Sequence, residues 1–107
     1  MERRRVVVTG LGAINAIGHN VEETWKSIKE GVCGIDEITN YDKELTKVKI
    51  AGEVKNFNAA DYLDKKAVRK MDRFTQFGVI AAKEAFKDAG LKIEEIDADR
   101  FGVVVSS

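Results

Sequence analysis

The side chains in this sequence with the clearest potential for binding chemistry are five closely spaced cations: Lys65, Lys66, Arg69, Lys70 and Arg73. On a helix, positions 66, 69, 70 and 73 would share one face, because residues three and four apart are neighbours there. Like charges so placed repel one another unless solvent or a partner offsets the repulsion. The charges alone leave two interpretations open: a solvated face with salt bridges to Asp64 and Asp72, or a binding site.

Two glycines near the N-terminus, Gly10 and Gly12, invite comparison with the phosphate-binding loop of dinucleotide-binding domains. That motif reads G-x-G-x-x-G and opens directly into a helix, whose N-terminus then holds the phosphate. Here Asn15 stands at the third glycine position, and the first helix is predicted to begin only after Asn20. We therefore favour a tight turn after a buried strand over an NAD-binding domain, and we expect no cofactor.

The single cysteine and the single histidine do not have the pattern of a catalytic pair. Cys33 follows the predicted C-terminus of a helix, where the negative end of the helix dipole disfavours a thiolate, so we expect an inert and partly buried cysteine. His19 has no Cys, Asp or Glu at metal-ligand spacing around it. We expect a loop histidine, and we predict neither a catalytic residue nor a metal site in this chain.

Length and composition limit the classes of protein to which the chain can belong. A chain of 107 residues is one domain at most, and its 18 basic residues balance 18 acidic ones, so neither nucleic acid nor an anionic membrane is indicated as a partner. No apolar run approaches the roughly 20 residues of a membrane-spanning helix. One cysteine cannot form an internal disulfide, which fits a reducing compartment, and we expect a cytoplasmic protein.

The longest helical pattern runs from residue 65 to residue 90 and carries the five cations on its first turns. Apolar side chains recur along it at three- and four-residue steps and predict one buried face: Met71, Phe74, Phe77, Ala81, Ala85 and Ala89. The segment 78–82 is apolar all round, so we expect it to be enclosed on several sides. Asp61 or Asp64 can cap the start of this helix, and Gly90 can end it in the left-handed conformation.

Two continuous β-branched runs flank this helix in the sequence, one at residues 6–8 and one in the segment 100–107. Continuous apolar character is typical of strands that are covered on both faces of a parallel sheet. Strand, helix and strand form a βαβ pattern, whose two strands run parallel. Two parallel strands leave open edges and do not make a stable sheet alone, so we expect residues 1–107 to be an incomplete N-terminal domain of a larger α/β protein.

A second helix is predicted from the N-cap Asn20, with Glu23 in a capping box, to the stop signal Gly31. Its apolar stripe is predicted to be buried and consists of Val21, Trp25, Ile28 and Val32. The connection 34–47 has no clear pattern and is expected to be irregular. The segment 47–54 alternates in part between polar and apolar residues, which predicts a half-exposed strand or a short hairpin.

Four stretches together resemble the start of a β-ketoacyl–acyl carrier protein synthase: RRVVVTGLG (4–12), VEETW (21–25), AGEV (51–54) and RKMDRF (69–74). The similarity is to the type II condensing enzymes of bacterial fatty acid synthesis, and it covers essentially the whole chain. It implies a thiolase-like α/β fold with α-β-α-β-α layers. Within that fold, this chain would supply the first strands and helices of the N-terminal half.

The resemblance also implies an acyltransferase that acts as a homodimer. In such enzymes a cysteine takes an acyl group from acyl carrier protein, malonyl–carrier protein loses CO₂, and the resulting carbanion attacks the thioester. Neither Cys33 nor His19 matches the catalytic cysteine or histidines of the family. We therefore expect this chain to lack the catalytic residues and to be inactive alone.

One functional site of the family does match residues of this chain. Lys66, Arg69 and Lys70 correspond to basic positions that engage the acidic helix of the carrier protein in related enzymes, so we predict a docking site there. Lys65 and Arg73 are second-rank contributors. A departure is Ala16, where the family usually has proline, which implies a less rigid loop over residues 11–19. The alternative to an enzyme is a carrier-protein docking segment that works without chemistry.

Overall fold

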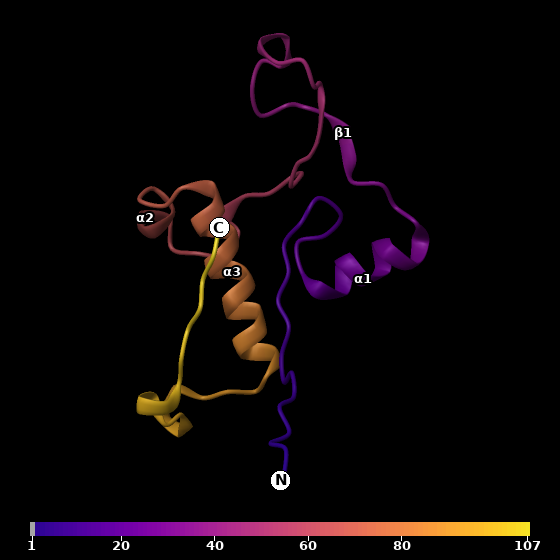
Figure 1. Cartoon of the computed structure of the whole chain (residues 1–107). Helices are drawn as coiled ribbons and strands as arrows, with labels where there is room; N and C mark the ends of the chain where they lie inside the picture. The colour runs from indigo at the N-terminus through magenta and orange to yellow at the C-terminus, as the bar shows by residue number, and fades with distance from the viewer. Residues whose placement is uncertain (1) are drawn as a thin grey trace.

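Helix α3 (Arg73–Asp88) is the longest element of the structure, and the other segments are arranged around it (Figure 1). The computed structural model describes residues 2–107. Within this range the other elements are, in chain order, α1 (Val21–Glu30), β1 (Ile35–Glu37), η1 (Lys43–Leu45), β2 (Ile50–Gly52), η2 (Ala59–Asp61), α2 (Lys65–Val68), η3 (Ile93–Glu95) and η4 (Ala98–Arg100), where η marks a short 3₁₀ helix.

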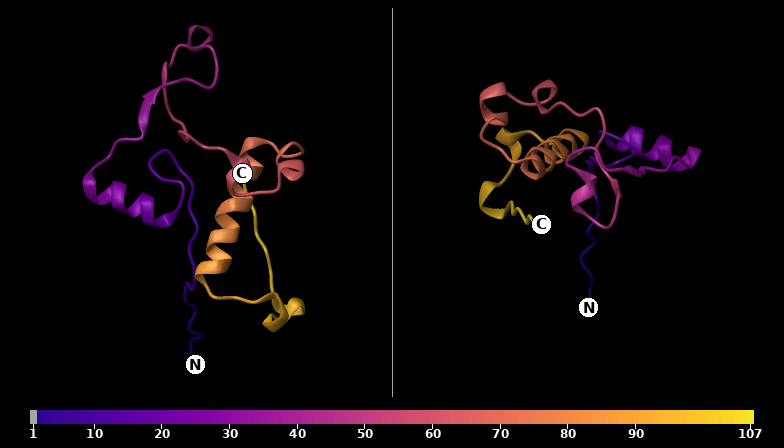
Figure 2. Two further views of the ribbon diagram at one scale, coloured as in Figure 1. Left: turned by 180° about the vertical axis from the view of Figure 1, so that it is seen from behind. Right: turned by 90° about the horizontal axis from the view of Figure 1, so that it is seen from above.

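The N-terminal segment lies against α3 and packs directly on the backbone of that helix (Figures 1 and 2). Gly10 and Gly12 permit this close approach. A Cβ added to Gly10 would lie 2.6 Å from the Ala89 nitrogen, and a Cβ added to Gly12 would collide with the Ala81 carbonyl. The two glycines therefore serve packing on a helix, not the predicted tight turn, and α3 fills the space beside Gly12 that a phosphate would need.

Two carboxylates of α3 hold the N-terminal segment in place. Asp88 Oδ2 accepts a hydrogen bond from the Leu11 N–H at 3.0 Å, and Glu84 Oε1 accepts one from the Ala13 N–H at 2.9 Å. The Glu84 carboxylate also accepts from the Val21 N–H, at 3.2 Å and 3.1 Å to its two oxygens. Because Val21 is the first residue of α1, Glu84 joins three parts of the chain: the N-terminal segment, α1 and α3.

The strands predicted at 6–8 and in 100–107 are not formed. Neither segment pairs with a strand in the described part of the chain, and both are exposed to solvent, with Val6 91% and Val104 99% accessible. Both segments run in the same direction and lie against α3, which is the course of a βαβ unit (Figures 1 and 2). The prediction is wrong because a strand needs backbone hydrogen bonds from a neighbouring strand, and neither segment has such a neighbour within residues 2–107.

Helix α1 begins and ends where the sequence predicts. Asn20 Oδ1 accepts from the Glu23 N–H at 2.8 Å, and Gly31 follows the helix in the left-handed conformation with φ 68°. The Glu23 carboxylate reaches one residue further back than in a capping box and accepts from the His19 N–H at 2.8 Å. The predicted buried stripe is wrong for this chain: Trp25 is 57% exposed, because α1 projects away from α3 (Figure 1).

The described residues form one sheet, in which β1 and β2 pair antiparallel with Ile35 opposite Gly52 and Glu37 opposite Ile50. Strand β2 lies within the segment 47–54, so the prediction of a strand or short hairpin there is confirmed. Its partner β1 lies in the connection that is predicted to be irregular. That prediction is wrong because a strand of three residues is too short to show a polar–apolar alternation.

The helical pattern of residues 65–90 is divided between two helices. Helix α2 ends at Val68, and the backbone at Asp72 is extended, with φ −67° and ψ 159°, before α3 starts. The apolar positions 71, 74 and 77 keep their three-residue spacing across this break, so periodicity alone predicts a single helix. The predicted stop is confirmed, since Gly90 follows α3 with φ 68°.

Few side chains are fully covered in this chain. The buried hydrophobic residues among those described are Ile38, Ala59, Leu63 and Ile80. The predicted enclosure of segment 78–82 is wrong beyond Ile80, since Gly78 and Ala82 are exposed. The Cα radius of gyration is 17.3 Å, whereas a compact domain of this length has about 13 Å. Large apolar surfaces on α1 and α3 thus remain open to solvent.

Candidate functional site

The five predicted cations, which we call the basic cluster, lie on three successive pieces of backbone. Lys65 and Lys66 are in α2, Arg69 and Lys70 are in the turn that follows, and Arg73 opens α3. All five residues are exposed. They do not share one face of a single helix, as the sequence pattern predicts, because the extended backbone before Arg73 separates the two helices.

Helix α2 is only four residues long, and a side-chain cap holds its start. The Asp64 carboxylate accepts from the Lys66 N–H at 3.2 Å and from the Ala67 N–H at 3.4 Å. Of the two predicted caps, Asp64 is therefore confirmed, whereas Asp61 lies in η2. Leu63, directly before the cap, is buried. The cap and the buried leucine together fix the place of the first two cations.

Hydrogen bonds on both sides define the turn that carries Arg69 and Lys70. The Met71 N–H donates to the Val68 carbonyl at 3.2 Å, which tightens the end of α2. The side-chain amide of Gln76 donates to the carbonyls of Val68 and Met71, at 3.3 Å and 3.2 Å. The backbone of the turn is thus held from within the chain, while the two cationic side chains face solvent.

No member of the basic cluster takes part in an ion pair within residues 2–107. The ion pairs of this range join Lys43 with Glu37, Lys49 with Glu44, Lys55 with Asp36 and Lys92 with Glu95. Asp64 serves as a helix cap instead, and Asp72 makes no side-chain cap hydrogen bond. The salt bridges of the solvated-face interpretation are therefore not formed, and the cluster keeps its positive charge for solvent or another molecule.

Arg73 differs from the other four cations because contacts within the chain hold its guanidinium. Its Nη2 donates to the Val54 carbonyl at 2.9 Å. The guanidinium carbon lies 5.8 Å from the ring centre of Phe57 and 5.3 Å from that of Phe77, which is within the range of cation–π attraction. Phe57 in turn stacks on Tyr62 at 5.8 Å. Arg73 thus anchors the start of α3 to the segment that follows β2.

Glu53, just after β2, is the one described side chain with a clearly shifted pKa. It accepts hydrogen bonds from the Thr39 hydroxyl at 2.7 Å and from the N–H groups of Thr39 and Asn40 at 3.1 Å. The Thr39 hydroxyl, followed by the Asn40 N–H, lowers the pKa of this carboxyl from its ordinary value of 4.5. The carboxylate therefore fastens the segment after β1 to β2.

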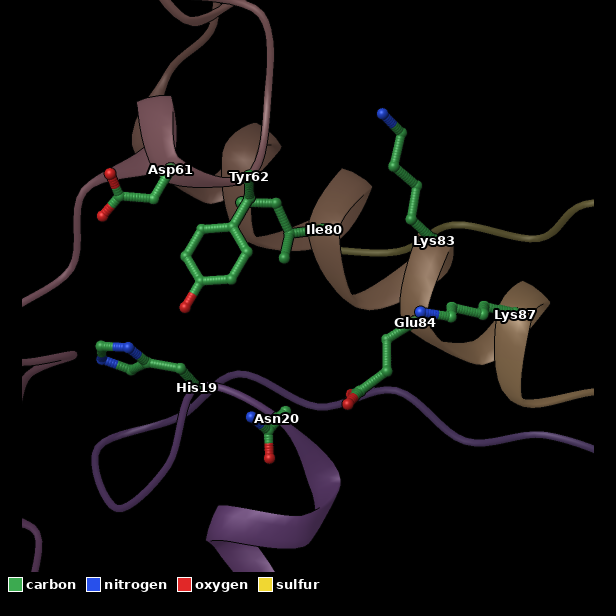
Figure 3. A pocket seen from close by; sticks show the side chains of 8 residues that line it. All are labelled: His19, Asn20, Asp61, Tyr62, Ile80, Lys83, Glu84 and Lys87. Atoms are coloured by element: carbon green, nitrogen blue, oxygen red, sulfur yellow. The ribbon is translucent and has the colours of Figure 1, made fainter.

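A cavity of about 450 Å³ lies between α3, η2 and the loop before α1 (Figure 3). It is lined by His19, Asn20, Asp61, Tyr62, Ile80, Lys83, Glu84 and Lys87. Two titratable groups of this lining are already engaged: His19 Nε2 lies 2.6 Å from the Lys55 carbonyl oxygen, and the Glu84 carboxylate accepts from the Val21 N–H at the start of α1. His19 also packs edge-on against Phe57 at 5.6 Å. As predicted, His19 lies in a loop, and its ring contacts connect this loop to the segment that contains Lys55 and Phe57.

Residues 2–107 contain no group of three or more His, Cys, Asp or Glu side chains that could hold a metal ion. Over the same residues, no helix combines the length and the apolar character needed to cross a bilayer. Cys33 is exposed, so the prediction of a partly buried cysteine is wrong. The reason is the same as for Trp25, since no other described segment covers the side chain of Cys33.

Comparison with known proteins shows the family. The family model described as "Beta-ketoacyl synthase, N-terminal domain" matches residues 3–107. This chain belongs to the β-ketoacyl synthase family. The domain is 53% identical over 106 residues to 3-oxoacyl-[acyl-carrier-protein] synthase 2 of Staphylococcus aureus (strain COL), and 44% identical over 107 residues to that of Synechocystis sp.. These alignments cover 99% and 100% of this chain and 26% of each relative, so the chain spans about a quarter of their length.

Solved ketosynthases resemble this β-ketoacyl synthase domain as well. The ishigamide ketosynthase/chain length factor is 37% identical with a TM-score of 0.78, over 89% of this chain and 24% of that one. The AntDE:AntF complex, a type II polyketide synthase acyl-carrier protein with its ketosynthase bound to the hexaketide, is 29% identical with a TM-score of 0.66, over 90% and 25%. The likeness confirms the predicted thiolase-like α/β fold class, to which this chain contributes helices and a small sheet.

Proposed function

We propose that the whole protein, with residues 1–107 as part of its N-terminal domain, is a 3-oxoacyl-[acyl-carrier-protein] synthase. Such an acyltransferase joins an acyl thioester to malonyl–acyl carrier protein with loss of CO₂. The observation that carries this proposal is the 53% identity, over 99% of the chain, to a relative of that name. We assign the reaction to fatty acid elongation, the pathway of the condensing enzymes that the four sequence stretches resemble.

We assign the bond-making chemistry to residues outside this chain. Cys33 follows the C-terminal end of α1, where the helix dipole gives a thiolate no stabilisation. The His19 ring is engaged with the Lys55 carbonyl and is not paired with a nucleophile among the described residues. The contribution of this domain is instead a surface on which a substrate carrier can dock.

The basic cluster is the proposed docking site for acyl carrier protein, with Lys66, Arg69 and Lys70 as the main contacts. These side chains are exposed and form no ion pair within the described residues, so they complement an acidic partner. A complex of a related ketosynthase with an acyl-carrier protein supports this class of partner. Lys65 and Arg73 are proposed as secondary contacts. Arg73 is secondary because its guanidinium already donates a hydrogen bond to the Val54 carbonyl.

We also infer a homodimer in the cytoplasm. The homodimer rests on the resemblance to condensing enzymes. The compartment rests on the assigned pathway.

A condensation assay tests the proposed reaction. The whole protein, incubated with acyl–carrier protein and malonyl–carrier protein, should yield a 3-oxoacyl–carrier protein that is longer by two carbons, with release of CO₂. The 107-residue chain alone should form no product and no acyl-enzyme on Cys33. Absence of product from the whole protein would overturn the reaction. Carrier-protein binding without product would favour a docking segment that works without chemistry.

A further inference from the structure

Gln76 lies one turn into α3, yet its side chain contacts the turn that precedes the helix. Its Nε2 atom is 3.3 Å from the Val68 oxygen and 3.2 Å from the Met71 oxygen. One amide group therefore bridges the end of α2 and the backbone just before the extended residue Asp72. The Gln76 side chain is partly buried, in contrast to the exposed cations of the basic cluster.

The two carbonyls differ in how far they depend on this donor. The last carbonyl groups of a helix have no partner inside the helix. Val68 is the last residue of α2, and its carbonyl also accepts from the Met71 N–H at 3.2 Å. Without the Gln76 amide, the Val68 carbonyl would keep only the Met71 N–H, and the Met71 carbonyl would turn to water. The hydrogen bonds by which Gln76 joins this turn to α3 would then be lost.

Arg69 and Lys70 stand between the two carbonyls that Gln76 binds. Fixing the carbonyls of Val68 and Met71 restrains the backbone dihedrals of the two residues between them, and so the directions in which their side chains leave the backbone. A surface that is ordered before binding loses less conformational freedom when its partner arrives. The Gln76 bridge can therefore affect how Arg69 and Lys70 bind a partner, although the Gln76 side chain itself is partly buried.

We propose that Gln76 is a positioning residue for carrier-protein docking, which holds the turn between α2 and α3 so that Arg69 and Lys70 face the partner together. This inference rests on the docking site proposed above. Gln76 acts through the backbone of the turn and does not touch the carrier protein.

The test is the variant Gln76→Met in the whole protein. Methionine keeps the unbranched length and a good helix propensity but has no N–H to donate. We expect KM for acyl–carrier protein to rise by about three- to tenfold, the effect of losing neutral hydrogen bonds. Both kcat and KM for a small-molecule acyl thioester should stay unchanged. The control Lys87→Met lies about 16 Å further along α3, beyond the screening length at physiological salt. It should change neither KM for acyl–carrier protein nor the kinetic constants for the small-molecule thioester.

A double-mutant cycle separates positioning from a general loss of structure. In the background Arg69→Glu/Lys70→Glu, adding Gln76→Met should raise KM for the carrier-protein substrate no further, because the positioned residues no longer bind it. An equal rise in both backgrounds, or an equal loss with the small-molecule thioester, would overturn the positioning role. If the methionine variant does not fold, Gln76→Leu, which is also uncharged, favours a helix and has no donor, replaces it, and failure of both to fold overturns the proposal.

The two proposals fail in different ways. If Arg69→Glu/Lys70→Glu leaves KM for acyl–carrier protein unchanged, the docking site itself is wrong. If that variant raises KM and Gln76→Met does not, the docking site stands and only the role of Gln76 is overturned.

Discussion

At the scale of residues, single carboxylates fasten the loops of this domain by accepting hydrogen bonds from backbone N–H groups. Glu84 binds the N–H groups of Ala13 and Val21, and Asp88 binds that of Leu11. Hydrogen bonds to a charged acceptor are about twice as strong as neutral ones. These roles could not be predicted from the sequence, because a glutamate in a helix gives no local sign of the distant N–H group that it binds.

Glu53 gives a prediction with a defined pH dependence. Its pKa is lowered in the folded state, so the stability that it contributes is fully present above its ordinary value of 4.5 and is lost as the pH falls through the lower folded value. In urea unfolding of the whole protein, Glu53→Gln should be less stable than the wild type above that pH, and the difference should shrink on acidification.

The control for this experiment is Glu30→Gln, at an exposed position with no hydrogen bond or ion pair in the described range. It should show no such convergence. A deficit of Glu53→Gln that stays constant as the pH falls below 4.5 would contradict the assignment of Thr39 and Asn40 as the partners that hold the carboxylate.

At the scale of elements, the sequence predicts those features that neighbouring residues determine. Both ends of α1, the Asp64 cap, strand β2 and the stop at Gly90 follow from local signals, and the structure confirms them. The break between α2 and α3 depends on the extended backbone at Asp72 and on the Gln76 bridge, while the apolar spacing continues across it. Strand β1 depends on pairing with β2, and a three-residue strand shows no pattern of its own.

The packing of the N-terminal segment on α3 gives a prediction at this scale. Gly12→Ala should destabilise the whole protein by about 1–3 kcal/mol, the usual cost of overpacking, because the new Cβ would collide with the Ala81 carbonyl. The loss of stability is measured from the change in the midpoint of urea unfolding.

The control is Gly78→Ala in α3, where an added Cβ meets no atom within 4 Å. Alanine in a helix interior is favoured over glycine by about 0.5–1 kcal/mol, so this variant should be neutral or more stable than the wild type. Equal destabilisation by the two substitutions would contradict the close approach of the N-terminal segment to α3.

At the scale of the whole molecule, the chain is extended and exposes much apolar surface. Its extents are 56 × 36 × 24 Å, and the exposed apolar residues include Val7, Trp25, Phe74 and Val105. The sequence predicts these residues to be buried, and within this chain they are not. Periodicity could not predict this exposure. An apolar stripe shows which face of an element tends to be buried, but it does not show whether the residues that bury it belong to the same 107-residue chain.

The isolated 107-residue chain should therefore associate with itself or lack a cooperative unfolding transition. The segment 101–107 is exposed and contains the β-branched run 103–105, and its unpaired edge favours pairing between molecules. Sedimentation and thermal unfolding measure both properties. A monodisperse monomer with one sharp transition would show that the described contacts suffice for an independent fold.

The central claim, that the turn between α2 and α3 engages acyl carrier protein, is tested most directly by Arg69→Glu/Lys70→Glu in the whole protein. Exposed charge pairs contribute about 0.5–1 kcal/mol each, so reversal of both should weaken carrier-protein binding by about five- to thirtyfold. The loss should shrink as ionic strength rises, and turnover of a small-molecule thioester should be unchanged. Unchanged carrier-protein affinity at low salt would contradict the claim and leave the basic cluster as a solvated surface.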